Sequence, residues 1–415
     1  MKMPDWRALR INAQRLHDDF SALSEIGSTG DGGVNRPTFS EAHFAARRWF
    51  LDRARATRLE TQIDAAGNHS ARLPAADPHA PTLLLGSHLD SVPFGGRFDG
   101  ALGVLAALEV LRTVKEAGLT LPVHLEAIDF TDEESTLVAL LGSRALAGQL
   151  TERDVQQPRG GRDALLAGLQ RAGLTEAGLW QAARPPATLV GYLELHVEQS
   201  ERLIDSSQQI GIVSALVGIH AYAITFQGRA DHAGTTPMSA RADAGLGAAA
   251  FMLAARQQVL QHFPGAVMNV GRLHLHPAAY NIVPERAELG LEFRAESDAR
   301  LKEMQEALLA LAEQVAEDDG LGLTVEQVAA VPAAPCAPAV RQAFATAADS
   351  LGLRHTELLS YAGHDAMSLA AICPAGMIFI PSTGGSHSHR EHADWADCVN
   401  GANVLLQAAL TLALA

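Results

Sequence analysis

A histidine and two aspartates follow an apolar run of strand length within residues 81–100. Glycines and a long helical pattern come next, which predicts a strand, a loop and a helix. Because side chains alternate along a strand, His88 and Asp90 are expected to face the same way, with Asp90 holding the imidazole while His88 faces a metal. Asp99 brings another carboxylate to the same end of the strand. Taken alone, the His-x-Asp pair favours a buried structural histidine and an N-cap aspartate.

Other segments of the chain repeat this arrangement. Strand-like patterns at 123–130, 189–199 and 376–381 run, in that order, into Glu133 and Glu134, into His196, and into His387. In open α/β sheets, sites form outside the carboxyl ends of the strands, so these residues are expected to converge. Imidazoles and carboxylates without thiolates suit zinc, and also manganese, cobalt or nickel. Asp99 is the natural bridge between two ions, which together would activate a water and polarise a carbonyl.

The acidic loop and the histidines each have a second interpretation. Carboxylates at Asp129, Asp132, Glu133 and Glu134 also fit a solvated loop, and an isolated His196 fits a satisfied core histidine. In the functional interpretation, one of the two adjacent glutamates binds metal and the other moves protons. The ordered set of segments favours the functional interpretation.

Composition limits the class of protein. The 415 residues, 47% hydrophobic and 19% charged, are typical of a soluble globular protein of two or three domains. A formal net charge of −15 argues against nucleic acid or an anionic membrane as partner, but not against an anionic small substrate. Three cysteines without a C-x-x-C pair suggest no disulfide framework and fit a reducing cytoplasm. The first residues show a charged amphipathic pattern, and we expect neither a signal region nor a membrane span.

Two changes of pattern divide the chain. Up to about residue 212, apolar strands alternate with helical segments, including a helix capped by Ser40 and a hairpin at Gly67-Asn68, which is typical of an α/β domain. An alternating segment, long helices and further strands then indicate a small α+β domain with an antiparallel sheet, and a Pro- and Ala-rich run marks the return. We therefore predict a discontinuous metal-binding catalytic domain, residues 1–213 and 329–415, and an inserted domain, residues 214–328.

These motifs together resemble one family nearly end to end. They are residues 86–103, 130–134, 194–199, 232–238, 281–284, 292–294, 363–366 and 386–387. They are similar to the dinuclear-metal amidohydrolases of the hydantoinase/carbamoylase group, which includes N-carbamoyl-L-amino acid hydrolases, β-ureidopropionases and allantoate amidohydrolases and is related to aminoacylases and metal aminopeptidases. The resemblance implies a mixed-sheet, aminopeptidase-like catalytic domain with an inserted dimerisation and lid domain, and hence a homodimer.

The resemblance also implies a role for each matched residue. His88, Asp99 and His196 would hold one divalent ion, and Asp99, Glu134 and His387 the other. Glu133 matches the general base, which takes a proton from the water and returns it to the leaving nitrogen.

Four further residues match substrate-binding or stabilising positions of the family. His232 matches a histidine that stabilises the tetrahedral oxyanion and is commonly lent by the partner subunit. Asn281 and Arg294 match residues that hold the substrate carboxylate, and Gln199 matches one that helps to bind the ureido group. Outside the family pattern, Arg294 would be a surface arginine at a strand end and Asn281 a turn residue.

The chain departs from the family pattern at three places. Ser135 stands where glycine is usual, and Tyr361 stands where a small residue is common, which would reshape the substrate pocket. In the last motif His389 lies two residues after His387 and is the alternative ligand. His364 and Asp365, which follow Tyr361 closely in the sequence, are expected to order their loop.

The implied reaction is hydrolysis of the carbamoyl C–N bond of an N-carbamoyl-L-amino acid to the amino acid, CO2 and ammonia. Allantoate and N-carbamoyl-β-alanine are alternative substrates, and an aminoacylase or dipeptidase using the same metals comes next. A non-catalytic binding protein of this fold would lack a ligand or the base, but every matched position is filled here.

Overall fold

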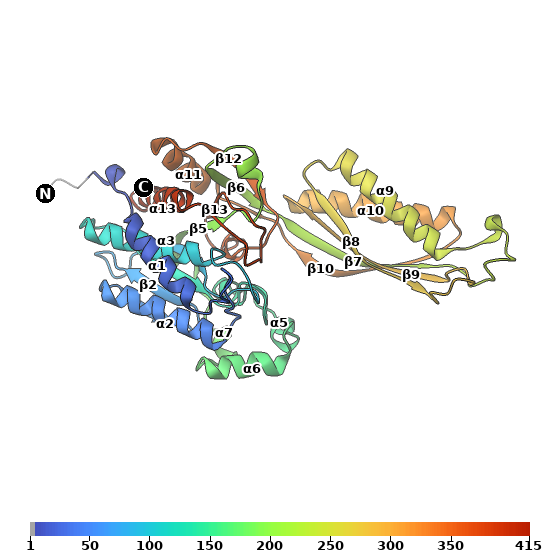
Figure 1. Cartoon of the computed structure of the whole chain (residues 1–415), viewed down its shortest axis with the longest axis horizontal. Coiled ribbons are helices and arrows are strands. Elements are labelled where there is room, and N and C mark those ends of the chain that lie inside the picture. The colour runs from blue at the N-terminus through green and yellow to red at the C-terminus, as the bar shows by residue number, and fades with distance from the viewer. Residues whose placement is uncertain (1–4) are drawn as a thin grey trace. The chain divides into compact units, whose positions relative to one another are not determined.

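The computed structural model describes residues 5–415, so the first residues of the amphipathic pattern lie outside the described part. The chain forms two compact units (Figure 1). The larger unit consists of Met1–Ser214, Cys336–Leu358 and Gly363–Ala415, and the smaller unit consists of Ala215–Pro335 and Leu359–Ala362.

The larger sheet is mixed. Within the described residues it has nine strands in the order β1-β2-β4-β3-β5-β13-β6-β11, with β12 beside β6. Their bounds are β1 Glu60–Ile63, β2 His69–Leu73, β3 Thr82–His88, β4 His124–Phe130, β5 Leu189–Val197, β6 Ile210–Leu216, β11 Ala334–Pro335, β12 His355–Ser360 and β13 Ala375–Ile380. The four central strands β4, β3, β5 and β13 are parallel, whereas β2 and β6 run antiparallel to their neighbours β4 and β13.

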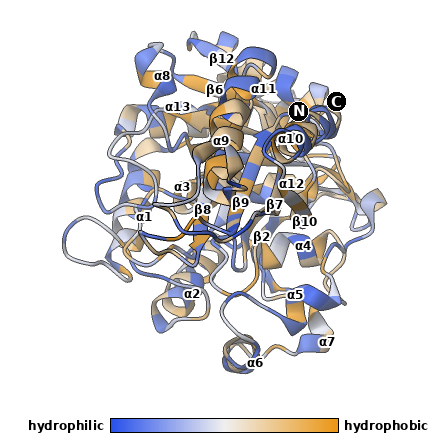
Figure 2. Cartoon of the chain, turned by 90° about the vertical axis from the view of Figure 1, so that its right-hand side faces the viewer, coloured by the Kyte–Doolittle hydropathy of each residue, from blue (hydrophilic) through white to orange (hydrophobic). Residues whose placement is uncertain are grey.

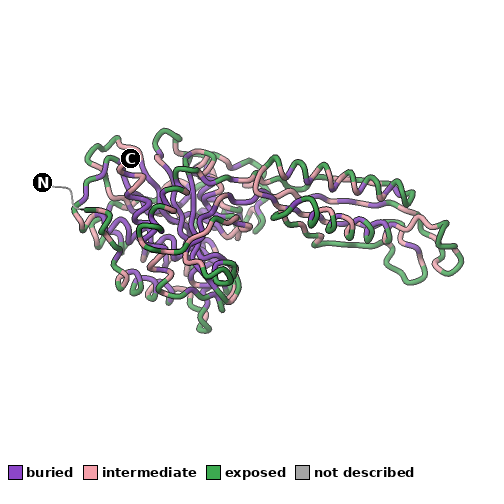
Figure 3. The backbone as a smooth tube through the Cα atoms, turned by 90° about the horizontal axis from the view of Figure 1, so that it is seen from above, coloured by how far each residue is buried: buried purple, intermediate pink, exposed green. Residues whose placement is uncertain are grey.

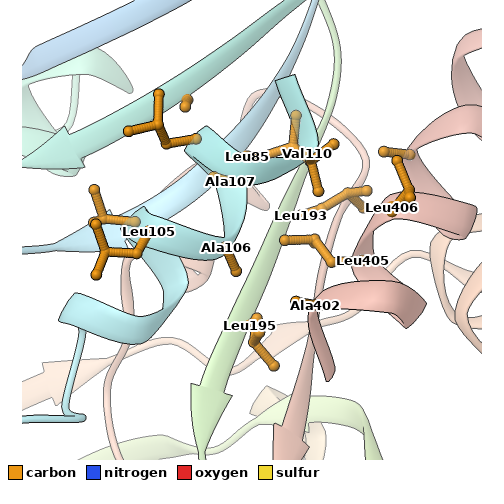
Figure 4. Close-up of a cluster of buried hydrophobic side chains, with 14 of the residues drawn as sticks. Leu85, Leu105, Ala106, Ala107, Val110, Leu193, Leu195, Ala402, Leu405 and Leu406 are labelled. Carbon is orange, nitrogen blue, oxygen red and sulfur yellow. The ribbon is translucent and has the colours of Figure 1, made fainter. Parts of the chain in front are cut away.

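The parallel strands are buried on both faces, so they are apolar without alternation. The helices of the larger unit are α1 Ala13–Glu25, α2 Glu41–Ala56, α3 Ala101–Glu116, α4 Leu141–Leu146, α5 Glu152–Gln156, α6 Arg162–Arg171, α7 Glu176–Leu179, α8 Arg202–Asp205, α11 Pro338–Ser350, α12 Asp365–Leu369 and α13 Trp395–Ala413. Figure 4 shows the core, in which α3 and α13 bring Val110 and Leu405 against Leu193 of β5. Buried residues accordingly concentrate in the interior of the larger unit (Figure 3).

The smaller unit is an α+β domain with an antiparallel sheet. Its strands, in the order β10-β7-β9-β8, are β7 Gly218–Gln227, β8 Val267–His276, β9 Arg286–Ala295 and β10 Gly322–Val331. The helices α9 Ala244–His262 and α10 Asp298–Asp318 cover one face of this sheet (Figure 1). Phe226, Phe251 and Phe293 lie in the core between helices and sheet, and β9 alternates between more and less buried positions, as a strand with one covered face should.

These observations confirm the predicted fold class, a mixed-sheet α/β domain with an α+β domain inserted in the sequence. Ser40 caps α2 by accepting a hydrogen bond from the His43 amide, and β1 and β2 form the expected hairpin. The helix α1 begins at Ala13, where Asn12 caps it by accepting a hydrogen bond from the Arg15 amide. The inserted domain was predicted to end at residue 328, but this residue lies within β10. Among the described residues, no helix has the length and apolarity needed to cross a membrane.

Gly86 provides a test of the parallel core. An added Cβ there would lie 2.0 Å from the Ile128 carbonyl oxygen on β4, a backbone atom that cannot move without disturbing the sheet. Gly86→Ala is therefore expected to lower the free energy of unfolding by about 3 kcal/mol, measured by urea denaturation. Gly363→Ala, where an added Cβ meets nothing within 4 Å, should change stability by less than about 0.5 kcal/mol. Equal stabilities of the two variants would contradict this packing.

Candidate metal centre

The carboxyl ends of the four central parallel strands meet at one edge of the larger sheet, as the sequence predicted. His88 is the last residue of β3, and His196 is the last but one of β5. The acidic loop follows β4, and the segment with His387 follows β13. Strand pairing sets His88 beside Phe130 of β4 and His196 beside Phe379 of β13, so the candidate residues start from the same level of the sheet.

His88, Asp99 and His196 form a first donor set. The Oδ1 atom of Asp99 lies 3.1 Å from His196 Nε2 and 3.4 Å from His88 Nε2. Ligands at about 2 Å around a tetrahedral zinc ion stand roughly 3.3 Å apart, so this spacing fits one ion. All three residues are buried, and His88 Nε2 has no hydrogen-bond partner among the described residues.

Asp99, Glu134 and His387 form a second donor set. His387 Nε2 lies 3.4 Å from Glu134 Oε2 and 3.7 Å from Asp99 Oδ2. Each carboxylate oxygen of Asp99 thus faces a different donor set, which is the arrangement of a bridging ligand. The alternative ligand His389 instead lies 4.0 Å from Asp31 through Nδ1.

Backbone carbonyl groups set the tautomers of the two buried histidines. His88 Nδ1 is 3.0 Å from the Asp90 carbonyl oxygen, and His196 Nδ1 is 2.9 Å from that of Val197. In its neutral form each imidazole therefore donates its Nδ1 proton to the backbone and carries its lone pair on Nε2. The Nε2 atom of His196 accepts a hydrogen bond from the Gly100 amide at 3.2 Å.

The expected role of the Asp90 side chain was wrong. Its carboxylate lies 3.7 Å from His88 Nδ1, farther than its own carbonyl oxygen, and accepts hydrogen bonds from the amides of Glu133 and Glu134. The physical reason is that β3 ends at His88, so the alternation assumed for Asp90 does not apply. The carboxylate orients the acidic loop instead of the imidazole.

Of the four carboxylates at the end of β4 and in the loop after it, two order the backbone and two face the donor sets. Asp129 accepts from Arg47 at 2.8 Å and from the Leu89 amide at 2.8 Å. Asp132 accepts from the amides of residues 136–138. Glu133 Oε2 lies 3.6 Å from His88 Nε2, so this carboxylate adjoins the first donor set while Glu134 belongs to the second.

Glu391 and Gln199 hold Asp99 in place. Glu391 Oε1 accepts hydrogen bonds from the amides of Phe98 and Asp99, and Gln199 Nε2 donates to Asp99 Oδ2 at 2.9 Å. An added Cβ at Gly96 would lie 2.4 Å from the Glu391 carboxyl carbon, so the close approach requires glycine. Burial raises the pKa of Glu391 to about 8. Nothing in the position of Glu391 along the sequence reveals that it accepts hydrogen bonds from these amides.

The donor sets fit divalent cations. Burial, with the charges of neighbouring carboxylates, raises the pKa of Glu133 and that of Glu134 well above the usual value. Such a group of buried carboxylates is costly unless cations are present, and the unpartnered His88 Nε2 points to the same requirement. Imidazole and carboxylate donors without thiolate match the ions expected from the sequence.

The wall of the first donor set includes His364. Its ring centroid is 4.5 Å from that of His196, and both residues are buried. His364 directly precedes α12, so its segment is packed into the site rather than lying on the surface.

The smaller unit carries the remaining three candidates. His232 pairs with Ile282 in a β-bridge, and the Ala233 amide donates to the Asn281 carbonyl oxygen, so His232 and Asn281 lie on adjoining loops. Arg294 instead lies near the far end of β9, where it contacts Glu292 and the Tyr361 carbonyl oxygen at 2.8 and 2.6 Å. Because β9 separates them, Asn281 and Arg294 are not brought together within one chain.

Comparisons with known proteins agree with the predicted resemblance. The profile of Peptidase family M20/M25/M40 matches residues 84–411. An N-carbamoyl-L-amino acid amidohydrolase from Geobacillus stearothermophilus is 37% identical, covering 97% of this chain and 99% of that protein. An allantoate amidohydrolase from Bacillus subtilis is 29% identical, covering 91% of this chain and 92% of that protein.

A solved structure shows the same likeness in three dimensions. An amidase of the hydantoinase/carbamoylase family from Burkholderia multivorans matches with a TM-score of 0.88 at 33% identity, covering 98% of this chain and 99% of that chain. The predicted resemblance is therefore confirmed, and the chain belongs to peptidase family M20/M25/M40 and, within it, to the hydantoinase/carbamoylase group of amidohydrolases.

Proposed function

We propose that this protein is a metal-dependent amidohydrolase that cleaves the carbamoyl C–N bond of an N-carbamoyl-L-amino acid. One water is consumed, and the amino acid, CO2 and ammonia are released. The observation that carries the proposal is the Asp99 carboxylate, whose two oxygens face two separate donor sets with Glu133 beside them. The relative from Geobacillus stearothermophilus, named for this activity, supports the choice of substrate.

His88, Asp99 and His196 would hold one divalent ion, and Asp99, Glu134 and His387 a second. Zinc suits these donors best, followed by manganese, cobalt and nickel, and the ions would supply Lewis acidity to the ureido carbonyl and to a water. Glu133 takes a proton from the attacking water and delivers it to the departing nitrogen as ammonia forms. Gln199, already bonded to Asp99 through Nε2, has its carbonyl oxygen to accept an N–H of the ureido group.

His232 is suited to donate a proton to the oxyanion. Its Nδ1 accepts from the amides of Gly234 and Thr235 at 3.0 and 3.2 Å. The neutral imidazole therefore carries its proton on Nε2, the nitrogen that is exposed on the loop. A donor of fixed tautomer on an exposed loop fits a role in stabilising developing negative charge.

Arg294 is the proposed partner of the substrate carboxylate. Glu292 and the Tyr361 carbonyl oxygen hold its guanidinium in one orientation, and a planar fork held in this way favours two-point binding of a carboxylate. The positive charge of Arg294 would also favour ureido acids over neutral ureas as substrates, despite the net negative charge of the chain.

A homodimer with the smaller unit as dimerisation and lid domain is part of the proposal. Asn281 precedes β9, and Arg294 is its last residue but one, so the strand from Arg286 to Arg294 separates them by roughly 25 Å. One substrate carboxylate cannot contact both residues of the same chain. Two subunits would each supply one of them, with His232 and Asn281 coming from the same loop pair.

The smaller unit has a surface suited to such a contact. Leu246, Leu253 and Leu260 of α9 repeat at seven-residue spacing and are 54%, 73% and 60% exposed, and α9 has a largely hydrophobic colouring in Figure 2. Next to α9, the edge strand β8 has one side that no strand of the described residues pairs with, and the two elements bound a 420 Å³ groove. An apolar heptad stripe beside a free strand edge is typical of a protein–protein contact.

Residence in the cytoplasm completes the proposal. All three cysteines are free and buried, and burial raises the pKa of the Cys336 thiol to about 12. Thiols of this kind are inert and fit a reducing compartment. Allantoate is the second candidate substrate, because the relative from Bacillus subtilis is named for it.

Ammonia release tests the reaction directly. Metal-stripped protein, with and without added Zn, Mn, Co or Ni, would be assayed with N-carbamoyl-L- and D-amino acids, N-carbamoyl-β-alanine, allantoate and N-acetyl-L-amino acids. We expect metal-dependent release of ammonia from the N-carbamoyl-L-amino acids and little from their D forms. Turnover of N-acetyl substrates alone would contradict the proposal in favour of an aminoacylase.

The adjacent glutamates form a matched pair of variants. Glu133→Gln should lower kcat by roughly 10² to 10⁴ because it removes the proton acceptor, while the bound metal remains. Glu134→Gln should lose metal together with activity, because it removes a ligand. Metal content by mass spectrometry, beside kcat, distinguishes the two. A substantially active Glu133→Gln enzyme would contradict its role as base.

Leu253→Glu tests the dimer. A charge in the middle of the α9 stripe should convert the dimer into a monomer in light scattering, with unchanged circular dichroism and retained metal. Activity should fall with dissociation if two subunits build each site. Leu166→Glu, on α6 at 37% exposure, is the control and should remain dimeric. A wild-type protein that is monomeric and active would refute the shared site.

A further inference from the structure

The larger unit has a pocket that none of the candidate donors lines. Its volume is 340 Å³, and it lies among α2, the end of α6 and the hairpin of β1 and β2. Arg47 and Arg48 of α2, with Arg171 at the end of α6, bring three guanidinium groups to its lining. In a chain of net charge −15, such a local excess of cations marks a separate feature of the surface.

Two of these cations have no partner among residues 5–415. Arg48 and Arg171 are exposed, and within the described residues neither side chain has a hydrogen bond or an ion pair. The one carboxylate of the lining, Glu41, is also exposed and is not paired with either. Arg15 and Arg184 of this unit, by contrast, are bound to carboxylates. The charges of Arg48 and Arg171 are therefore available to a ligand.

The base of the pocket is a rigid cation. Arg47 is 2% exposed, and it donates to Asp129, Gly67, Phe130 and Thr131. These four bonds use four of the five guanidinium N–H groups, and the fifth, on Nη1, has no partner among the described residues. A guanidinium held on its other sides is preorganised to receive one more acceptor.

The remaining lining combines apolar side chains with Glu41 and His69. Phe44 contributes a partly buried ring, and Ile63 is 52% exposed at the rim. His69 Nδ1 lies 2.8 Å from the Gly67 carbonyl oxygen, so its other nitrogen is the one free to meet a ligand. A cavity that joins apolar walls to a few charged groups is the usual form of a small-molecule site.

We propose that this pocket binds a small organic anion, an apolar body bearing a carboxylate or phosphate group. The anionic oxygens bind Arg48 and Arg171 and the open N–H of Arg47, and the body packs on Phe44 and Ile63. This site is separate from the proposed metal centre, and its occupation does not depend on the reaction.

The pocket is nevertheless connected to the metal centre. Arg47 binds one oxygen of Asp129, and the other oxygen accepts from the Leu89 amide directly after His88. The Nη2 atom of Arg47 also binds Thr131 at the start of the acidic loop. A ligand on Arg47 thus contacts the side chain that supports both the His88 end of β3 and the loop with Glu133.

Calorimetric titration of the full-length protein tests the proposal, with phenyl phosphate, benzoate and inorganic phosphate as probes. We expect saturable binding of phenyl phosphate or benzoate. Inorganic phosphate should bind about tenfold more weakly, because it lacks the apolar part that packs against the pocket. Whichever organic anion binds more tightly identifies the head group. Absence of saturable binding by both organic probes would overturn the proposal, as would equal binding of inorganic phosphate.

Variants assign the binding to this pocket. Arg48→Gln and Arg171→Gln should each raise Kd at least about fivefold, and Ile63→Ser should weaken the organic probes but not inorganic phosphate. Arg153→Gln, which makes the same charge change on an exposed side chain of α5, and Arg294→Ala should both bind as the wild type does. Binding that survives the double Arg48→Gln, Arg171→Gln change, or that is lost in Arg294→Ala, would refute the assignment.

Discussion

The structure of the larger unit depends on one shared carboxylate. Asp99 faces His88 and His196 with one oxygen and His387 with the other, so a small rotation of its side chain would disturb both donor sets. This constraint explains the buried Glu391, which fixes the backbone of Asp99 although burial disfavours its charge. It also explains why the loop needs a glycine at 96, where any side chain would displace Glu391. The position of the bridging Asp99 carboxylate thus depends on residues that do not themselves face the donor sets.

A second constraint is the charge buried behind the donors. Carboxylates without cations would be unstable there, and the two buried guanidinium groups of Arg36 and Arg47 offset part of the charge. Arg47 pairs with Asp129, whereas Arg36 donates to carbonyl oxygens, including that of Leu89. Burial lowers the pKa of Arg36 to about 10, so it remains charged at neutral pH. Both arginines lie in the first fifty residues, which explains why an N-terminal segment without candidate ligands is built into the support of the site.

The sequence was sufficient for the parts of the fold that local chemistry determines. Apolar runs ending in histidine or carboxylate revealed the central strands, and Ser40 and the Gly67-Asn68 turn marked a helix start and a hairpin. Contacts between distant segments were not accessible in this way. Arg47 meets Asp129 only because β2 and β4 are neighbours, and Glu391 meets Asp99 across nearly three hundred residues. The error at Asp90 has a local cause, since alternation holds only while the strand continues, and β3 stops two residues earlier.

The smaller unit shows the same limit at the level of assembly. In sequence, Asn281 and Arg294 are close, and both match residues that bind one carboxylate, which suggests neighbours in space. A fully extended β9 lies between them and directs them to opposite ends of the sheet, with Arg294 paired to the start of β7 and the Asn281 loop bonded to the segment after its end. No rotation of side chains closes a gap the length of a strand. If both residues serve one substrate, the complete site must belong to a pair of chains, and the exposed leucine stripe of α9 beside the free edge of β8 is the surface through which such a pair would form.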